Sequence, residues 1–182
     1  MFKLILSVVV LAVVVAAQEE EEINYDFIFE KMETVEGSEQ YCEYNYTMEK
    51  LSEYNFKLSG NFFTPKELNN DFGIVFTLSR AEVGSEEFEE MMHISKPLCE
   101  YMKTIYRMYF YESVKDISNF PHFDECPLPG QKEYWIKEYL FEGEGYKAFT
   151  RDGHFKIEFY LTKDGANVAG AVTTMTVKPV EK

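Results

Sequence analysis

The feature that most constrains the fold of this chain is a two-residue alternation of apolar and polar side chains along most of its length. In residues 155–161, for example, Phe, Ile, Phe and Leu alternate with Lys, Glu and Tyr. A period of two indicates a half-buried β-strand. Similar runs predict strands at residues 24–30, 40–50, 53–63, 72–82, 134–142 and 168–177, while residues 85–94 fit either an edge strand or a helical turn.

Turn signals separate these runs. Asp164-Gly165 stands between the last two alternating runs, and an Asp-Gly pair in that position is a strong hairpin signal. Seven or eight antiparallel strands at regular spacing predict a mainly β protein, an antiparallel β-sandwich with one helix. No internal repeat and no linker interrupts residues 23–182, so we expect them to form a single domain.

The one predicted helix spans about residues 96–114. Ser95 is a good N-cap residue, and Pro97 would lie in the first turn, where a missing N–H costs little. One apolar stripe runs along the helix and consists of Leu98, Met102, Ile105 and Tyr109. Such a stripe indicates a helix packed on a core.

The first residues are typical of a secretory signal peptide. Lys3 precedes an apolar run at residues 4–15, and Ala16-Ala17 provides the small residues of a cleavage site. The run is shorter than the roughly 20 residues that span a bilayer. We therefore expect a signal peptide at residues 1–17, an acidic leader at 18–22 and a secreted, extracellular protein.

The charge of the chain excludes one class of partner. The formal net charge is −14, and removal of the segment with Lys3 makes it −15. Such an excess of negative charge repels polyanions at long range. We therefore exclude nucleic acid as a partner.

Three cysteines, Cys42, Cys99 and Cys126, stand in a chain expected to reach an oxidising compartment, where disulfides persist. The favoured disulfide joins Cys99 to Cys126 and staples the helix to the segment after Phe120. Cys42 is then either a buried free thiol or the arm of an intermolecular bridge, and a free cysteine packs well as a small apolar residue.

Asn45-Tyr46-Thr47 is an acceptor triplet for N-linked glycan. If the triplet is used, Asn45 must lie on the outer face of its strand. Strand alternation then places Cys42, Tyr44, Tyr46 and Met48 on the inner face.

Four short motifs resemble a family of small secreted insect proteins of the ML-type lipid-recognition superfamily. This family includes the CheA and CheB contact-chemosensory proteins and is allied to the ganglioside activator protein. The motifs are Leu58-Ser59-Gly60-Asn61-Phe62, Pro97-Leu98-Cys99, Cys126-Pro127-Leu128-Pro129-Gly130 and Gly153-His154-Phe155-Lys156. The resemblance covers roughly residues 25–179.

The resemblance implies a cup-shaped sandwich whose sheets separate to hold an acyl or hydrocarbon chain. It implies a carrier of lipids, hydrocarbons or pheromone-like ligands, with a role in chemosensation as one alternative. A membrane receptor and a Cys42-linked dimer are open alternatives for further partners. The chain departs from its relatives in one respect, because relatives commonly have more bridging cysteines in the N-terminal half, where this chain has Cys42 alone.

A lipid pocket needs a wide apolar wall, so the candidate ligand contacts are the inward residues of the strands and the helix stripe. For each of them, an ordinary core position is the competing interpretation. Trp135 is the favoured single contact, because its ring can hold a chain while its N–H finds a partner. The full set is Phe56, Leu58, Phe76, Leu78, Met102, Ile105, Tyr109, Trp135, Tyr139, Phe155, Phe159 and Met175.

No motif in the sequence predicts catalysis. The histidines His93, His122 and His154 are scattered without metal-ligand spacing, and no nucleophile elbow or phosphate loop occurs. We expect no enzyme activity, no metal and no cofactor. The main alternative to a carrier is a secreted protein-interaction module with a fully packed core and an acidic surface. A hydrolase is a third alternative, because a catalytic triad is defined by geometry and can be invisible in a sequence.

Overall fold

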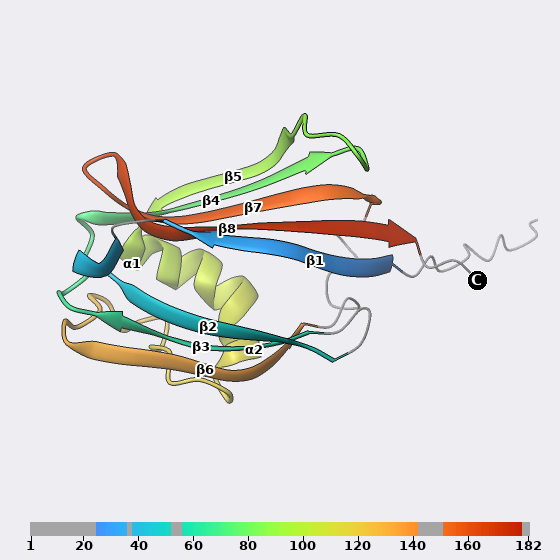
Figure 1. Ribbon diagram of the computed structural model, residues 1–182. Helices are drawn as coiled ribbons and strands as arrows, with labels where there is room; N and C mark the ends of the chain where they lie inside the picture. The colour runs from blue at the N-terminus through green and yellow to red at the C-terminus, as the bar shows by residue number, and fades with distance from the viewer. Residues whose placement is uncertain (1–24, 36–37, 52–55, 142–150, 180–182) are drawn as a thin grey trace, which may run out of the picture.

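The computed structural model describes residues 25–35, 38–51, 56–141 and 151–179. Within them, two antiparallel sheets face each other, and a helical segment lies between the sheets (Figure 1). This arrangement confirms the predicted mainly β sandwich. None of the described helices is both long and apolar enough to cross a membrane. The predicted signal peptide and acidic leader lie outside the described residues.

The larger sheet has the strand order β1-β8-β7-β4-β5. Its strands are β1 Tyr25–Thr34, β4 Phe72–Ala81, β5 Glu89–Pro97, β7 Gly153–Lys163 and β8 Ala166–Pro179. The smaller sheet has the order β2-β3-β6. Its strands are β2 Glu43–Lys50, β3 Phe56–Thr64 and β6 Lys132–Phe141, and the short helix η1, Ser38–Gln40, precedes β2. The ambiguous segment at 85–94 contributes to β5, an edge strand.

The hairpin between β7 and β8 is confirmed. Lys163 pairs with Ala166 across the turn, and the two central residues, Asp164 and Gly165, have φ of 50° and 79°. Positive φ at both central residues is the requirement of the turn that best matches the twist of two strands. The Asp-Gly pair thus determines where β7 ends and β8 begins.

A bulge in β6 explains the imperfect alternation of its sequence. The pairing of β3 with β6 shifts register at Ser59. At this point two residues of β6, 137 and 138, lie opposite the single β3 residue Ser59. Glu138 has φ of 52°, and its backbone N–H donates to Ser59 Oγ at 2.9 Å. Because a bulge adds one unpaired residue, the alternation of faces reverses beyond it. Ile136 and Tyr139 therefore lie on the same face of the sheet.

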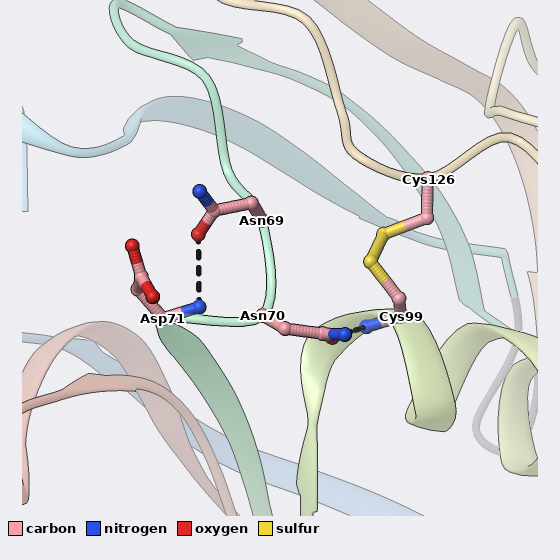
Figure 2. Close-up of a disulfide and its surroundings, with 5 residues drawn as sticks. All are labelled: Asn69, Asn70, Asp71, Cys99 and Cys126. Carbon is pink, nitrogen blue, oxygen red and sulfur yellow. Dashed lines mark hydrogen bonds between the residues drawn. A yellow bond between two sulfur atoms is a disulfide. The ribbon is translucent and has the colours of Figure 1, made fainter.

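The helical segment consists of α1 Leu98–Tyr101, the π-helix η2 Met102–Phe110 and α2 Tyr111–Val114. The predicted cap at Ser95 is wrong, because β5 continues through Ser95 to Pro97. No side chain of the helix entry caps it. Instead, Asn70 Oδ1 accepts a hydrogen bond from the Cys99 N–H at 3.0 Å (Figure 2). An amide from a distant loop thus satisfies one N–H of the first turn.

The π-helix also changes which residues face inward. Met102 is buried and Ile105 packs on the core, as predicted. Tyr109, in contrast, is 62% exposed, so its predicted place on the inner stripe is wrong. The prediction assumed 3.6 residues per turn, whereas a π-helix bonds i to i+5 and has a wider turn. Tyr106 packs against the core instead.

The disulfide between Cys99 and Cys126 is present, with 5.5 Å between the Cα atoms, which confirms the predicted pair (Figure 2). It ties the start of the helix to the loop before β6. In the same region, Leu68 and Leu128 exchange two backbone hydrogen bonds, of 3.0 and 2.9 Å. The helix, the loop after β3 and the loop before β6 are thereby held together at one end of the sandwich.

Among the described residues, two groups of buried apolar side chains pack together. The larger group surrounds the start of the helix and comprises Leu68, Phe72, Ile74, Leu98, Tyr101, Met102, Leu128, Leu161 and Ala169. The smaller group has Phe155 and Val177 buried, with Leu78 and Met175 packed against them. Of these two groups, only the larger includes residues of the helical segment.

Replacing both bridging cysteines, as Cys99→Ser with Cys126→Ser, should lower the free energy of unfolding by about 3 to 4 kcal/mol. The reason is that the bridge closes a chain segment with a separation of 27 residues, which constrains the unfolded chain by about this amount. Urea denaturation followed by circular dichroism measures the change. Cys42→Ala is the matched control and should cost less, since Cys42 forms no bridge. A double variant as stable as the parent would contradict the structural role of the bridge.

Candidate binding cavity

A cavity of about 490 Å³ lies next to the larger core group. Its walls come from both sheets and from the helical segment. The lining residues are Met32, Thr34, Cys42, Tyr44, Asn45, Tyr46, Leu58, Gly60, Asn61, Phe62, Leu68, Ile74, Leu98, Tyr101, Met102, Tyr106, Phe120, Pro121, Leu128, Ile136, Phe159, Leu161, Ala169, Gly170 and Ala171. Its volume falls within the range of about 300 to 1,000 Å³ that is usual for small-molecule sites.

The lining is apolar in character. Among the described residues that form it, none carries a formal charge at neutral pH. Phe159 lines the cavity, and 38% of its surface is accessible. A wall of this composition favours a hydrophobic occupant and disfavours a charged one.

Most of the tyrosine hydroxyls in the lining already have partners. The hydroxyls of Tyr44, Tyr46 and Tyr106 donate to the backbone carbonyls of Gly170, Met32 and Pro121, at 3.0, 3.4 and 3.1 Å respectively. Burial, followed by the charges of Tyr111 and Glu125, raises the pKa of Tyr106 to about 12. These tyrosines present mainly their rings to the cavity and use their hydroxyls to link the lining elements.

Tyr101 differs from these residues. It is only 8% exposed, and its ring meets the ring of Phe159 edge-on at 6.1 Å between centroids. Burial, with a smaller contribution from Tyr106, raises the pKa of Tyr101. Its hydroxyl therefore stays protonated and remains a hydrogen-bond donor.

Cys42 lines the cavity as a half-buried free thiol. Burial raises the pKa of the thiol to about 11, and the neighbouring carboxylate of Glu43 adds to the shift. The thiolate, which is the nucleophilic form, is therefore scarce at neutral pH. This environment agrees with the buried-thiol interpretation of Cys42.

Three of the predicted contacts line the cavity: Leu58, Met102 and Phe159. They come from β3, the helical segment and β7, which are far apart in the sequence. The structure therefore brings together one predicted residue from each wall. The predicted contacts that do not line it are Phe56, Phe76, Leu78, Ile105, Tyr109, Trp135, Tyr139, Phe155 and Met175.

Several of these nine residues are ordinary core residues. Leu78, Phe155 and Met175 belong to the smaller core group, away from the helix. Phe56 is buried and packs against Phe29, with 6.1 Å between ring centroids. They face inward as predicted, but at a part of the sandwich that is filled by side chains.

Trp135 lies on a different face from the one expected. It neighbours the cavity-lining Ile136 in β6, so its side chain points to the opposite side of the sheet. There the Lys137 ammonium lies 4.5 Å from the ring centroid, and Asn119 Oδ1 accepts the Trp135 backbone N–H at 2.6 Å. Sequence alternation placed Trp135 and Tyr139 on one face, whereas the β6 bulge between them separates the two.

Most residues of the lining were not among the predicted contacts, including Tyr101, Tyr106, Phe62 and Ile74. Tyr101 had a detectable signal, because it stands three residues after Leu98, a spacing that shares a helix face. Tyr106 had a similar signal, because it stands four residues after Met102.

The predicted glycan triplet lies on the surface of β2. Asn45 is exposed on β2, as the predicted glycan site requires, and so are Glu43 and Thr47. Within the described part of the chain, no three His, Cys, Asp or Glu side chains gather in a way that could hold a metal ion.

Part of the chain matches a family model, and its fold resembles a solved structure. The model of a family described as "Protein of unknown function (DUF1091)" matches residues 74–157. No curated protein matches the chain. Eight chains of solved structures match, among them a crystal structure of chicken MD-1 complexed with lipid IVa, with 12% identity, a TM-score of 0.40 and coverage of 85% of this chain and 98% of that chain.

Proposed function

We propose that this protein is a secreted, non-enzymatic carrier that encloses a lipid, hydrocarbon or pheromone-like molecule between its two sheets. The observation that carries the proposal is the uncharged cavity of about 490 Å³ beside the helix. Secretion rests on the signal-like segment at residues 1–17. A role in chemosensation rests on the family resemblance of the sequence alone.

The energetics of burial are sufficient for such a role. At about 25 cal/mol per Å², burying roughly 300 Å² of hydrocarbon yields about 7 kcal/mol before association costs. No charged group of the lining has to lose its hydration, since none is present among the described residues. Apolar burial alone can therefore hold a chain-shaped ligand.

The cavity disfavours the main alternative, an interaction module with a fully packed core. Protein interiors rarely contain voids larger than a water molecule, and an open space of this size loses packing contacts unless a ligand fills it. Native mass spectrometry of protein secreted from eukaryotic cells distinguishes the two. A species of a few hundred daltons that is lost on denaturation supports a carrier, whereas an empty mass that is unchanged after incubation with lipids supports the packed module.

The masses of the same samples also test signal-peptide cleavage, glycosylation of Asn45 and the pairing of Cys42. A carrier with the expected processing begins at Gln18 and has a glycan on Asn45. A doubled mass that collapses with reductant would reveal a Cys42-linked dimer. Such a dimer would contradict the assignment of Cys42 to the cavity wall.

Filling the cavity should weaken binding. Ala171 lines the cavity and pairs with Phe159, so Ala171→Trp places an indole in the space that the ligand would occupy. We expect at least a tenfold loss of affinity, about 1.4 kcal/mol or more, for a fluorescent apolar probe such as N-phenylnaphthylamine. Val172→Trp is the matched control, because it adds the same group on the other face of β8. Equal binding by both variants would argue against this cavity as the site.

The thiol of Cys42 offers a measurement of cavity access that is sensitive to pH. Because its pKa is raised to about 11, the rate of modification by uncharged methyl methanethiosulfonate should rise about tenfold per pH unit from pH 7 to pH 10. An ordinary exposed thiol levels off near pH 8.5 to 9, and glutathione serves as that control. Saturation with tetradecane should slow the reaction of Cys42. A plateau near pH 8.5, or no protection by the alkane, would contradict its place in the cavity wall.

A further inference from the structure

Tyr101 has an unused hydrogen-bond donor at the wall of the cavity. The described residues offer its hydroxyl no hydrogen-bond partner, although the side chain is more than nine-tenths buried. No fully enclosed side-chain nitrogen or oxygen of the described residues lacks a partner. The Tyr101 hydroxyl must therefore keep contact with open space, and the cavity is the space that Tyr101 lines.

The other tyrosines of the lining differ from Tyr101, because their hydroxyls already have hydrogen-bond partners. Tyr44, Tyr46 and Tyr106 each donate to a backbone carbonyl. A donor left without a partner in an apolar site has a free-energy cost, and a ligand acceptor removes that cost. Among the tyrosines of the lining, Tyr101 is thus the one whose hydroxyl can add a directional contact to apolar burial.

The lining also limits the kind of acceptor. No Lys, Arg or His lies among the described lining residues, so a carboxylate or phosphate buried there would have no counter-ion. Burying an unpaired charge costs far more than one hydrogen bond returns. A neutral oxygen, as in a ketone, an ester or an aldehyde, accepts the Tyr101 proton without that cost.

We propose that the ligand is a neutral, long-chain compound with one carbonyl-type oxygen, and that the Tyr101 hydroxyl donates a hydrogen bond to this oxygen. The inference rests on the proposed carrier function and specifies its ligand class. The apolar chain lies against residues such as Met102, Phe159 and Leu161, and the hydrogen bond determines which end of the molecule lies next to the helix.

The test compares two probes with the same number of heavy atoms, methyl undecyl ketone and tetradecane. Each displaces N-phenylnaphthylamine from the wild type and from Tyr101→Phe, which keeps the ring and removes the hydroxyl. We expect the variant to weaken ketone binding about 3- to 10-fold, the effect of one hydrogen bond, and to change alkane binding less than twofold. Tyr160→Phe is the matched control, since Tyr160 donates to Glu158 at 3.2 Å on the other face of β7.

Tetradecanoate tests the requirement for a neutral head group. At pH 7.5 it is ionised, and we expect it to compete at least tenfold more weakly than the ketone. Binding tighter than that of the ketone would overturn the neutral ligand class. Equal losses for ketone and alkane in Tyr101→Phe, or no loss for either, would overturn the role of Tyr101 while leaving the carrier intact.

Two results separate this inference from the proposed function. If the wild type binds none of the three probes, the carrier proposal itself fails. If Tyr101→Phe does not fold, infrared spectra of the ketone carrying ¹³C at its carbonyl decide the question on the wild type. A stretch lowered relative to that in alkane solvent supports the hydrogen bond, and an unshifted stretch overturns it.

Discussion

The position of the helical segment between the two sheets is the constraint on which the rest of the structure depends. The Cys99–Cys126 bridge and the Asn70 cap hold its first turn, so the segment cannot withdraw from between the sheets. Since the helix is wider than a layer of side chains, the sheets cannot close on each other at that end. The space that remains is the cavity, whereas the part away from the helix is filled by the smaller core group.

The wall of the cavity combines two kinds of residue with different tasks. Aliphatic and aromatic side chains such as Ile74, Phe62 and Leu161 provide area without direction. Tyrosines provide links, because their hydroxyls reach carbonyls on neighbouring elements. Tyr44, for example, reaches Gly170 on β8 from β2, which connects the two sheets across the cavity. Tyr101 alone among the buried tyrosines of the lining leaves its donor for an occupant.

The sequence predicted the strands well because each is decided by local alternation. The Asp164-Gly165 turn and the period-two pattern of 155–161 require no knowledge of distant residues, and the disulfide followed from a small number of cysteines. Predictions failed where a local irregularity changed the facing of side chains. A bulge at Glu138 separated Trp135 from Tyr139, and the π-helix exposed Tyr109.

The sequence by itself determined the fold class, the position of the hairpin, the helix, the bridge and the uncharged character of the inner faces, because these depend on residue type and short spacings. Only the tertiary structure decided which inward residues form a core and which form a cavity. That distinction depends on the separation of the sheets at each point, which the stapled helix determines. Leu58 and Leu78 have the same alternation in sequence, yet one lines the cavity and the other fills the core.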